Sequence, residues 1–247
     1  MTLAQTRKTD GIVTITMQRP EKRNALSPEL IRDLGAAVNA VAADAGARVL
    51  ILAGEGRSFC AGMDLDGVLD DPAAMGGMLA DLSRASRALR RLEIPTIARV
   101  QGAAVGGGCG LMVVTDFAIT HPEAKVGYPE VSLGVCPAVV APWLMRKVAP
   151  GRARAMLLAG GLITGQEAFE QGLATHIADR DGLEDAAIEF ASHLASGGPN
   201  ALAVTKRWIN ELDGSLEDDV LDRAAALSAE VIAGEEAQTR LRAILRP

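Results

Sequence analysis

The sequence predicts an α/β fold in which parallel strands are connected by helices. The order of apolar strand, glycine-bearing loop and helix repeats at least twice between residues 48 and 120. The run 49–53 is apolar throughout, which is typical of a strand covered on both faces. From residue 138 onward the pattern is helical. With 247 residues, 49% of them hydrophobic, the chain can build one large domain and a C-terminal helical segment.

Two strands, a polar loop and a helix account for the first 46 residues. Residues 3–8 and 11–17 alternate in polarity around Asp10-Gly11, a pair typical of a tight hairpin turn. Ser27 followed by Pro28 predicts the start of a helix, because serine caps helices and proline suits their first position. We expect this helix to end at Gly46.

The middle of the chain carries the parallel repeat. We expect strands at 49–53, 96–101 and 117–120, and a helix over about 78–92. Strands joined in this way lie parallel, with right-handed connections. Residues 66–77 are acidic and glycine-rich, so we expect a mobile loop there.

The C-terminal half predicts helices with few strands. We expect helices near 138–149, 151–159, 165–171, 183–196, 200–212, 215–233 and 235–245, with connectors at 162–165 and 175–177. Gly197-Gly198-Pro199 marks a boundary between a core of residues 1–197 and a helical segment of residues 198–247. Since fifty residues cannot easily bury themselves alone, we expect this segment to pack on the core or on another subunit.

Composition excludes several classes of function. A net charge of −6 argues against nucleic acid as a partner, and no uncharged stretch is long enough to span a membrane. Cys60, Cys109 and Cys136 form no CxxC pair, so we expect free thiols in a reducing cytoplasm. The N-terminus has no apolar signal-like region, and the three histidines are too scattered to predict a metal site.

Two glycine loops follow strands of the predicted parallel repeat. One contains residues 60–64, and the other contains the triplet Gly106-Gly107-Gly108. Loops at the carboxyl ends of parallel strands converge on one crevice, so a backbone N–H from each loop could flank a single oxygen atom. Such a pair stabilises an enolate or a tetrahedral oxyanion. Tight packing of a helix on the sheet is the structural alternative for the triplet.

The order of these motifs resembles that of the crotonase superfamily, which contains the enoyl-CoA hydratases and isomerases. The resemblance rests on six motifs in the same order along the chain: Arg19-Pro20, residues 24–26, residues 58–65, Gly102 with residues 106–110, residues 129–134 and residues 160–173. It implies a crotonase-type ββα spiral with a helical C-terminal trimerisation segment. It also implies a homotrimer or homohexamer and an acyl-CoA substrate. No metal and no separate cofactor are expected, because coenzyme A is part of the substrate.

The resemblance also assigns catalytic residues. The N–H groups of Met63 and Gly107 would hold the thioester oxygen, and Glu130 would move the proton. Related hydratases place a further glutamate two residues after the triplet, where this chain has Gly110. A single carboxylate can add water, or it can carry a proton from one carbon atom to another.

Further residues are implied in substrate binding. They are Arg23, Ala25, Ala61, Asp64, Leu65 and Gly106. Arg19 and Lys22 lie in the loop that would meet the nucleotide, and Lys206 with Arg207 could complete its phosphate site. Tyr128, Asp66, Asp70 and Asp71 are auxiliary candidates for which a structural role is the simpler interpretation.

Hydration of a 2-enoyl-CoA through an enolate is therefore the predicted reaction. The alternatives are Δ3-Δ2 isomerisation of an enoyl-CoA by the single glutamate, other acyl-CoA chemistry such as thioester hydrolysis or decarboxylation, and non-catalytic binding of an acyl-CoA.

Overall fold

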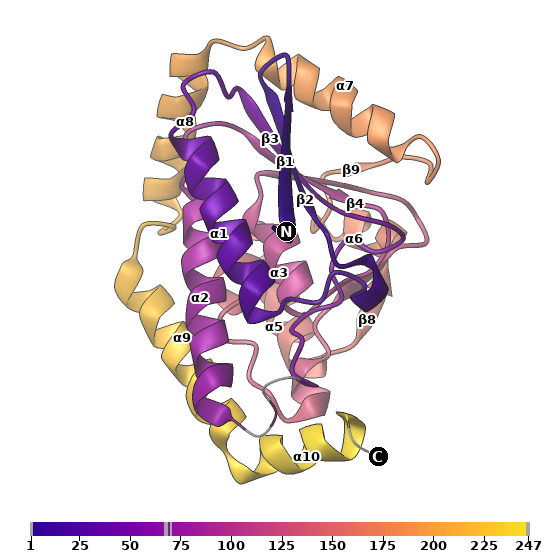
Figure 1. Ribbon diagram of the computed structural model, residues 1–247, viewed down its shortest axis with the longest axis vertical. Coiled ribbons are helices and arrows are strands. Elements are labelled where there is room, and N and C mark those ends of the chain that lie inside the picture. Colours follow the sequence, from indigo (N-terminus) through magenta and orange to yellow (C-terminus); the bar gives the residue numbers. More distant parts are fainter. Residues whose placement is uncertain (1, 67–68, 70, 246–247) are drawn as a thin grey trace.

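A six-stranded sheet forms the centre of the computed structural model, which describes residues 2–66, 69 and 71–245 (Figure 1). The strand order is β1-β2-β3-β4-β6-β9. Only β1 and β2 pair antiparallel within this sheet, and the other four pairs are parallel, so the predicted α/β fold is confirmed. The bounds are β1 Ala4–Thr9, β2 Ile12–Met17, β3 Val49–Gly54, β4 Thr96–Val100, β6 Phe117–Thr120 and β9 His176–Ile177.

The hairpin between β1 and β2 forms where the sequence predicts it. Its register runs from Ala4 opposite Met17 to Thr9 opposite Ile12. Asp10 and Gly11 have φ values of 51° and 80°, the left-handed conformation that a two-residue hairpin loop needs.

Helices cover both faces of the sheet. The helices α1 (Pro28–Ala42) and α2 (Pro72–Arg90) lie side by side over one face, and α7 (Leu183–Ala195) crosses the other (Figure 1). Leu50 and Leu52 of β3 belong to the apolar cluster beneath α1 and α2, whereas Val49 and Ile51 pack with Ala187 of α7. The uninterrupted apolar run of this strand is therefore explained by burial on both sides.

A smaller three-stranded sheet lies beside the central one, in the order β5-β7-β8. It consists of β5 (Ala104–Val105), β7 (Lys125–Gly127) and β8 (Leu162–Thr164). We expected 162–165 and 175–177 to be connectors, but most of these residues form β8 and β9. Strands of two or three residues are too short to show the alternation that predicts a strand.

Helix α2 begins six residues earlier than predicted. The Asp71 side chain accepts a hydrogen bond of 3.0 Å from the Ala74 N–H and caps the helix, with Pro72 in its first turn. Residues 72–77 are therefore helical, and the expectation of a mobile loop over this part is wrong. Packing of α2 against α9 (Asp218–Ala233) offsets the low helix propensity of Gly76 and Gly77.

The other helices agree with the predicted positions to within a few residues. Their bounds are α3 Gly107–Val114, α4 Ala141–Lys147, α5 Pro150–Ala159, α6 Gly165–Glu170, α8 Pro199–Leu212 and α10 Glu235–Leu245, with short 3-10 helices η1 Pro20–Lys22 and η3 Glu130–Leu133. No helix in the described ranges combines the length and the apolar character needed to cross a bilayer.

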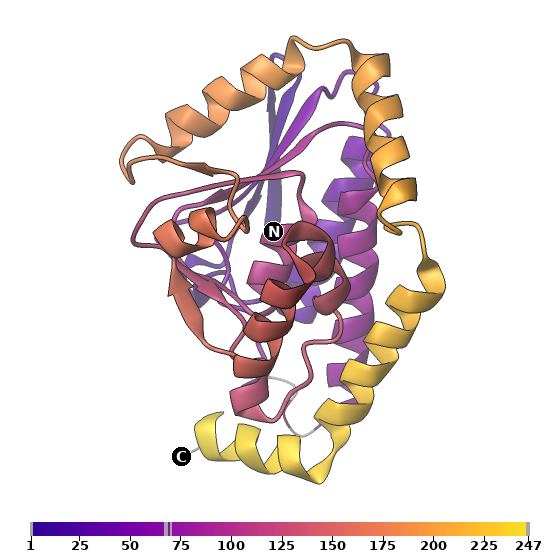
Figure 2. The same cartoon turned by 180° about the vertical axis from the view of Figure 1, so that it is seen from behind.

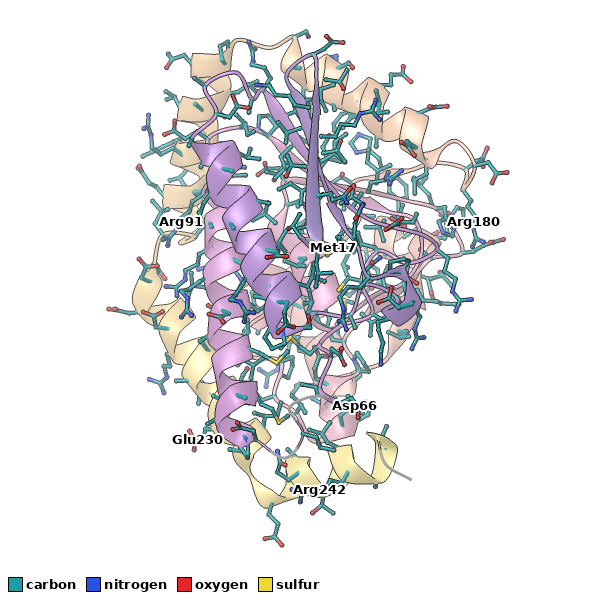
Figure 3. All side chains as sticks on the ribbon, viewed as in Figure 1. Met17, Asp66, Arg91, Arg180, Glu230 and Arg242 are labelled. Atoms are coloured by element: carbon teal, nitrogen blue, oxygen red, sulfur yellow. The ribbon has the colours of Figure 1, made fainter. Side chains whose placement is uncertain are left out.

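The C-terminal segment folds back along the core of its own chain. Helix α8 starts at Pro199, α9 runs beside α2, and α10 turns across the end of the molecule (Figures 1 and 2). Arg91, just after α2, points to the junction of α8 and α9 (Figure 3), where it bonds the Ser215 carbonyl and Asp218. Contacts between α10 and η3 place α10 near the candidate site.

Candidate active site

The two glycine loops are bonded to one another through their backbones. The Cys60 N–H donates to the Ala103 carbonyl at 2.8 Å, and the Val105 N–H donates to the Cys60 carbonyl at 3.0 Å. Gly108 must lack a side chain, because a Cβ there would lie 2.3 Å from the Cys60 carbonyl oxygen. The structure thus brings the two loops together, and close packing between them explains part of the glycine triplet.

Gly106 and Gly107 form the turn into helix α3. Gly106 has a φ of 54°, which favours glycine, and its N–H donates to the Gly127 carbonyl at 2.8 Å. Gly107 is the first residue of α3, so its N–H has no acceptor within the helix. Within the described part of the chain, neither this N–H nor that of Met63 donates a hydrogen bond. The Met63 sulfur lies 3.7 Å from the place of a Cβ at Gly107, so both free amides belong to one small region.

Glu130 reaches the same region from η3. Its Oε1 lies 2.9 Å from the place of a Cβ at Gly106, and its buried Oε2 has no hydrogen-bond partner among the described residues. Burial raises the pKa of the Glu130 carboxyl to about 7. Both its acid and its base form are therefore populated near neutral pH, as a general acid/base requires.

An apolar cavity of about 120 Å³ connects these groups. Met63, Gly106, Gly107 and Glu130 line it together with Leu65. Among the described lining residues, Glu130 is the only one with a carboxylate, and none has a basic side chain. The remaining walls come from α2, η3, the segment before α4 and α9, and include Leu79, Leu82, Leu133, Val135, Val139, Val140 and Ile232. A mostly apolar pocket with few convergent polar groups is the usual form of a small-molecule site.

The sequence did not predict the contribution of α2 and α9 to this cavity. Leu79 and Leu82 lie on the buried face of α2, and their spacing indicates an amphipathic helix without showing that it borders a ligand. Ser228 and Ile232 bring α9 to the same wall. The Ser228 hydroxyl is already engaged, because it donates to the Cys136 carbonyl at 3.0 Å and accepts from the Val139 N–H.

The polar loop after β2 lies beside the first glycine loop. The Arg19 guanidinium pairs with Asp64 at 2.8 Å and also donates to the Ala25 carbonyl. The exposed Arg23 has a φ of 53°, and its carbonyl accepts the Ala61 N–H at 3.0 Å. Arg23 is therefore available to solvent, whereas Asp64 has a structural partner and lies outside the lining of the cavity.

Asn24 positions these loops, a role that its place in the sequence did not reveal. It is fully buried, and its side-chain amide donates to the carbonyls of Glu55 and Ser58 at 3.0 and 2.8 Å. Its amide oxygen accepts the Arg19 N–H at 2.9 Å. Its φ of 55° is a signal that sequence alone does not contain.

Lys206 does not extend the basic loop. It is buried, and its ammonium donates to Asp116 at 2.7 Å and to the Ile94 carbonyl at 2.8 Å. Burial lowers the pKa of Lys206, although Asp116 opposes the effect. Arg207 is exposed and pairs with Glu93 at 3.5 Å. The expectation that Lys206 helps to bind a phosphate is therefore wrong, because the Asp116 carboxylate already holds its ammonium.

The auxiliary candidates stand apart from the cavity. Tyr128 is buried outside its lining, Asp71 caps α2, and the exposed Asp66 lies toward the end of the molecule crossed by α10 (Figure 3). Asp70 lies outside the described residues. Across the described ranges, no group of three or more histidine, cysteine, aspartate or glutamate side chains could hold a metal ion.

Comparisons with known proteins identify relatives with named activities. A sequence model of the enoyl-CoA hydratase/isomerase family matches residues 7–242. The chain is similar to 1,2-epoxyphenylacetyl-CoA isomerase of Escherichia coli, with 35% identity over 222 residues, 86% of this chain and 83% of the relative. It is also similar to crotonyl-CoA hydratase of Syntrophomonas wolfei, with 32% identity over 226 residues, 90% of this chain and 85% of the relative. The crystal structure of an enoyl-CoA hydratase/isomerase from Mycobacterium paratuberculosis matches with a TM-score of 0.90 and 27% identity, covering 98% of both chains.

Proposed function

Because the chain belongs to the enoyl-CoA hydratase/isomerase family of the crotonase superfamily, we propose that it converts enoyl-CoA thioesters through an enolate. One observation carries the proposal. The carboxyl of Glu130, whose buried Oε2 has no hydrogen-bond partner among the described residues, shares an apolar cavity with two backbone amides from separate loops that donate no hydrogen bond there. This arrangement offers hydrogen bonds to a developing negative charge and a group that exchanges a proton beside it.

In this proposal the Met63 and Gly107 amides bind the thioester oxygen. The oxygen gains negative charge when the enolate forms, so these hydrogen bonds strengthen in the transition state. Gly107 also lies at the N-terminus of α3, where the helix dipole favours negative charge. The apolar walls exclude water and thereby strengthen both interactions.

Two reactions can proceed through this enolate. In hydration, the Glu130 carboxylate takes a proton from water while the hydroxide oxygen bonds to C3, and a proton is then delivered to C2. In isomerisation of a 3-enoyl-CoA, Glu130 removes a proton from C2 and returns it to C4 as the double bond moves to C2–C3. The resemblance alone places hydration first. The presence of one carboxylate among the described residues of the cavity favours isomerisation, the other candidate.

Binding of the coenzyme A moiety is assigned to the polar loop and the first glycine loop. The exposed guanidinium of Arg23 suits a phosphate, and the backbones of Ala25 and Ala61 lie beside it. The acyl chain would occupy the cavity lined by Leu65. Coenzyme A enters with the substrate, so the proposed reactions need no separate cofactor. A cytoplasmic trimer or hexamer remains part of the proposal.

Product analysis tests the proposed function. The protein is incubated separately with 2-enoyl- and 3-enoyl-CoA thioesters of several chain lengths, and the products are separated by chromatography with mass detection. Hydration adds the mass of one water molecule, whereas isomerisation changes retention without changing mass. Binding without conversion of any thioester would contradict the enzymatic function and favour a non-catalytic acyl-CoA binder.

The variant Glu130→Gln tests the assigned acid/base. We expect turnover to fall by at least about 10²-fold, which is the scale of general acid/base catalysis, because an amide cannot exchange the proton. Affinity for the thioester should stay within a few-fold. The wild-type rate should rise with pH through about 7, as Glu130 becomes the base. Equal turnover by wild type and variant would remove Glu130 from its role.

A further inference from the structure

Position 110 is occupied by glycine because the neighbouring residues leave no room for a side chain there. It lies within helix α3 and needs no left-handed backbone, since its N–H donates to the Gly106 carbonyl at 2.9 Å as in an ordinary helix. A Cβ at Gly110 would lie 2.4 Å from Val140 Cγ1 and 3.3 Å from Val140 Cβ. Beyond the adjoining residues and the backbone of α3, Val140 supplies the only described atoms within 4 Å of that place.

Val140 is held firmly in this position. It is 5% exposed and directly precedes α4, where its N–H donates to the Pro137 carbonyl and its own carbonyl accepts the Leu144 N–H at 3.1 Å. A β-branched side chain has few rotamers, so Val140 cannot readily turn aside. The space in front of Gly110 is therefore filled by hydrocarbon.

The filled space borders the candidate site. Gly110 is three residues after Gly107, and residues so spaced share one face of a helix. Val140 lines the same cavity as Gly107 and Glu130. A side chain at position 110 would therefore enter the wall of the cavity at the place that Val140 now occupies.

We infer that Val140 determines which reaction the site performs, by denying a water molecule a second polar partner beside Glu130. This inference rests on the proposed function. A buried water needs two to four polar partners, and the wall formed by Val139 and Val140 provides hydrocarbon. Isomerisation needs no water, because the proton that Glu130 takes from C2 is the one that it returns to C4. The wild-type protein should therefore isomerise 3-enoyl-CoA faster than it hydrates 2-enoyl-CoA.

Three variants test the role of Val140. Val140→Thr keeps the shape of the side chain and adds a hydroxyl that can hold water. Val140→Gly empties the space, and the double variant Gly110→Glu with Val140→Gly uses that space for a second carboxylate. The measured quantity is the ratio of the initial rate of hydration of 2-enoyl-CoA to the initial rate of isomerisation of 3-enoyl-CoA.

We expect this ratio to rise at least threefold in Val140→Thr and at least tenfold in the double variant. Val148→Thr is the matched control, because Val148 is buried like Val140, directly follows α4 and lies outside the lining of the cavity, so its ratio should stay within twofold of wild type. If circular dichroism shows that the double variant does not fold, the rate ratio of the nearly isosteric variant Val140→Thr alone tests the inference.

The possible failures are distinguishable. No turnover of either thioester by the wild type would contradict the proposed function itself. An active wild type whose ratio is unchanged in the folded Val140 variants would contradict only the inference about Val140. An equal rise in Val148→Thr would also overturn it, because a hydroxyl outside the cavity would then have the same effect.

Discussion

The burial that prepares Glu130 for proton transfer also lowers the stability of the folded chain. The carboxyl has a pKa of about 7 in the folded state, against an ordinary value of 4.5, because desolvation penalises its charged form. The folded state therefore binds more protons than the unfolded state between these two values. It follows that the free energy of unfolding falls as the pH rises from about 4.5 to about 7.

Replacing Glu130 with glutamine should remove this pH dependence. The variant should be more stable than wild type by about 2–3 kcal/mol at pH 8, since one pKa unit corresponds to 1.36 kcal/mol, and the difference should shrink to below about 1 kcal/mol at pH 5. Urea unfolding at pH 5 and at pH 8 measures this difference in stability.

The exposed Glu29 is the control. Hydrogen bonds from its backbone and Ser27 hold its pKa below the usual range, so Glu29→Gln should show no change over this interval. A wild type as stable as Glu130→Gln at pH 8 would mean that Glu130 is not desolvated.

The meeting of the two glycine loops could be predicted from the sequence, because glycines constrain backbone geometry. The family resemblance then named Met63 and Gly107, which line one cavity with Glu130, and their catalytic roles stay predictions. Sequence reasoning failed for Lys206, because a charge in a helix carries no sign of its partner on another element. Val140 was not predicted either, since its importance arises from a contact with Gly110 across 30 positions of sequence.

At the scale of elements, long helices were predictable and short strands were not. The spacing of apolar residues located α7, α8 and α10 nearly to the residue. The two-residue strands β5 and β9 exist because neighbouring strands offer them partners, a tertiary effect that local pattern does not contain. The start of α2 was hidden by its two glycines, which lower helix propensity although α9 supports the helix there.

The paired glycines of α2 should respond differently to alanine. A Cβ at the exposed Gly77 would meet nothing within 4 Å among the described residues, so Gly77→Ala should stabilise the fold by about 0.5–1 kcal/mol through helix propensity. A Cβ at Gly76 would lie 3.2 Å from the Ala229 Cβ of α9. Gly76→Ala should therefore stabilise the fold less than Gly77→Ala does, or destabilise it, because α2 and α9 must move apart to make room for the methyl group. Thermal unfolding of both variants measures the difference, and equal stabilisation would show that α9 does not approach α2 so closely.

At the scale of the whole molecule, the C-terminal segment is joined to the core by buried polar contacts as well as by apolar packing. Asp116, just before β6, accepts hydrogen bonds from the Thr96 N–H and hydroxyl and from the ammonium of Lys206 on α8. Farther along, Ile232 of α9 closes one wall of the cavity. The contact between Lys206 and Asp116 thus anchors α8 to the core of its own chain.

Two neighbouring cations on α8 allow this anchoring to be tested. Lys206→Met leaves the partly buried Asp116 without its nearest cation, although Arg90 remains at 3.7 Å, so we expect a loss of about 2–4 kcal/mol in the free energy of unfolding. Arg207→Met removes the same charge one residue later. It should cost less than about 1 kcal/mol, because its pair with Glu93 is exposed.

Urea unfolding gives the free energy of unfolding of both variants, and the KM for an acyl-CoA thioester should change little in either of them. A KM that rises in Lys206→Met while stability is retained would return Lys206 to the phosphate site. A large loss of stability in Arg207→Met but not in Lys206→Met would show that the exposed face of α8, rather than Asp116, attaches this helix to the core.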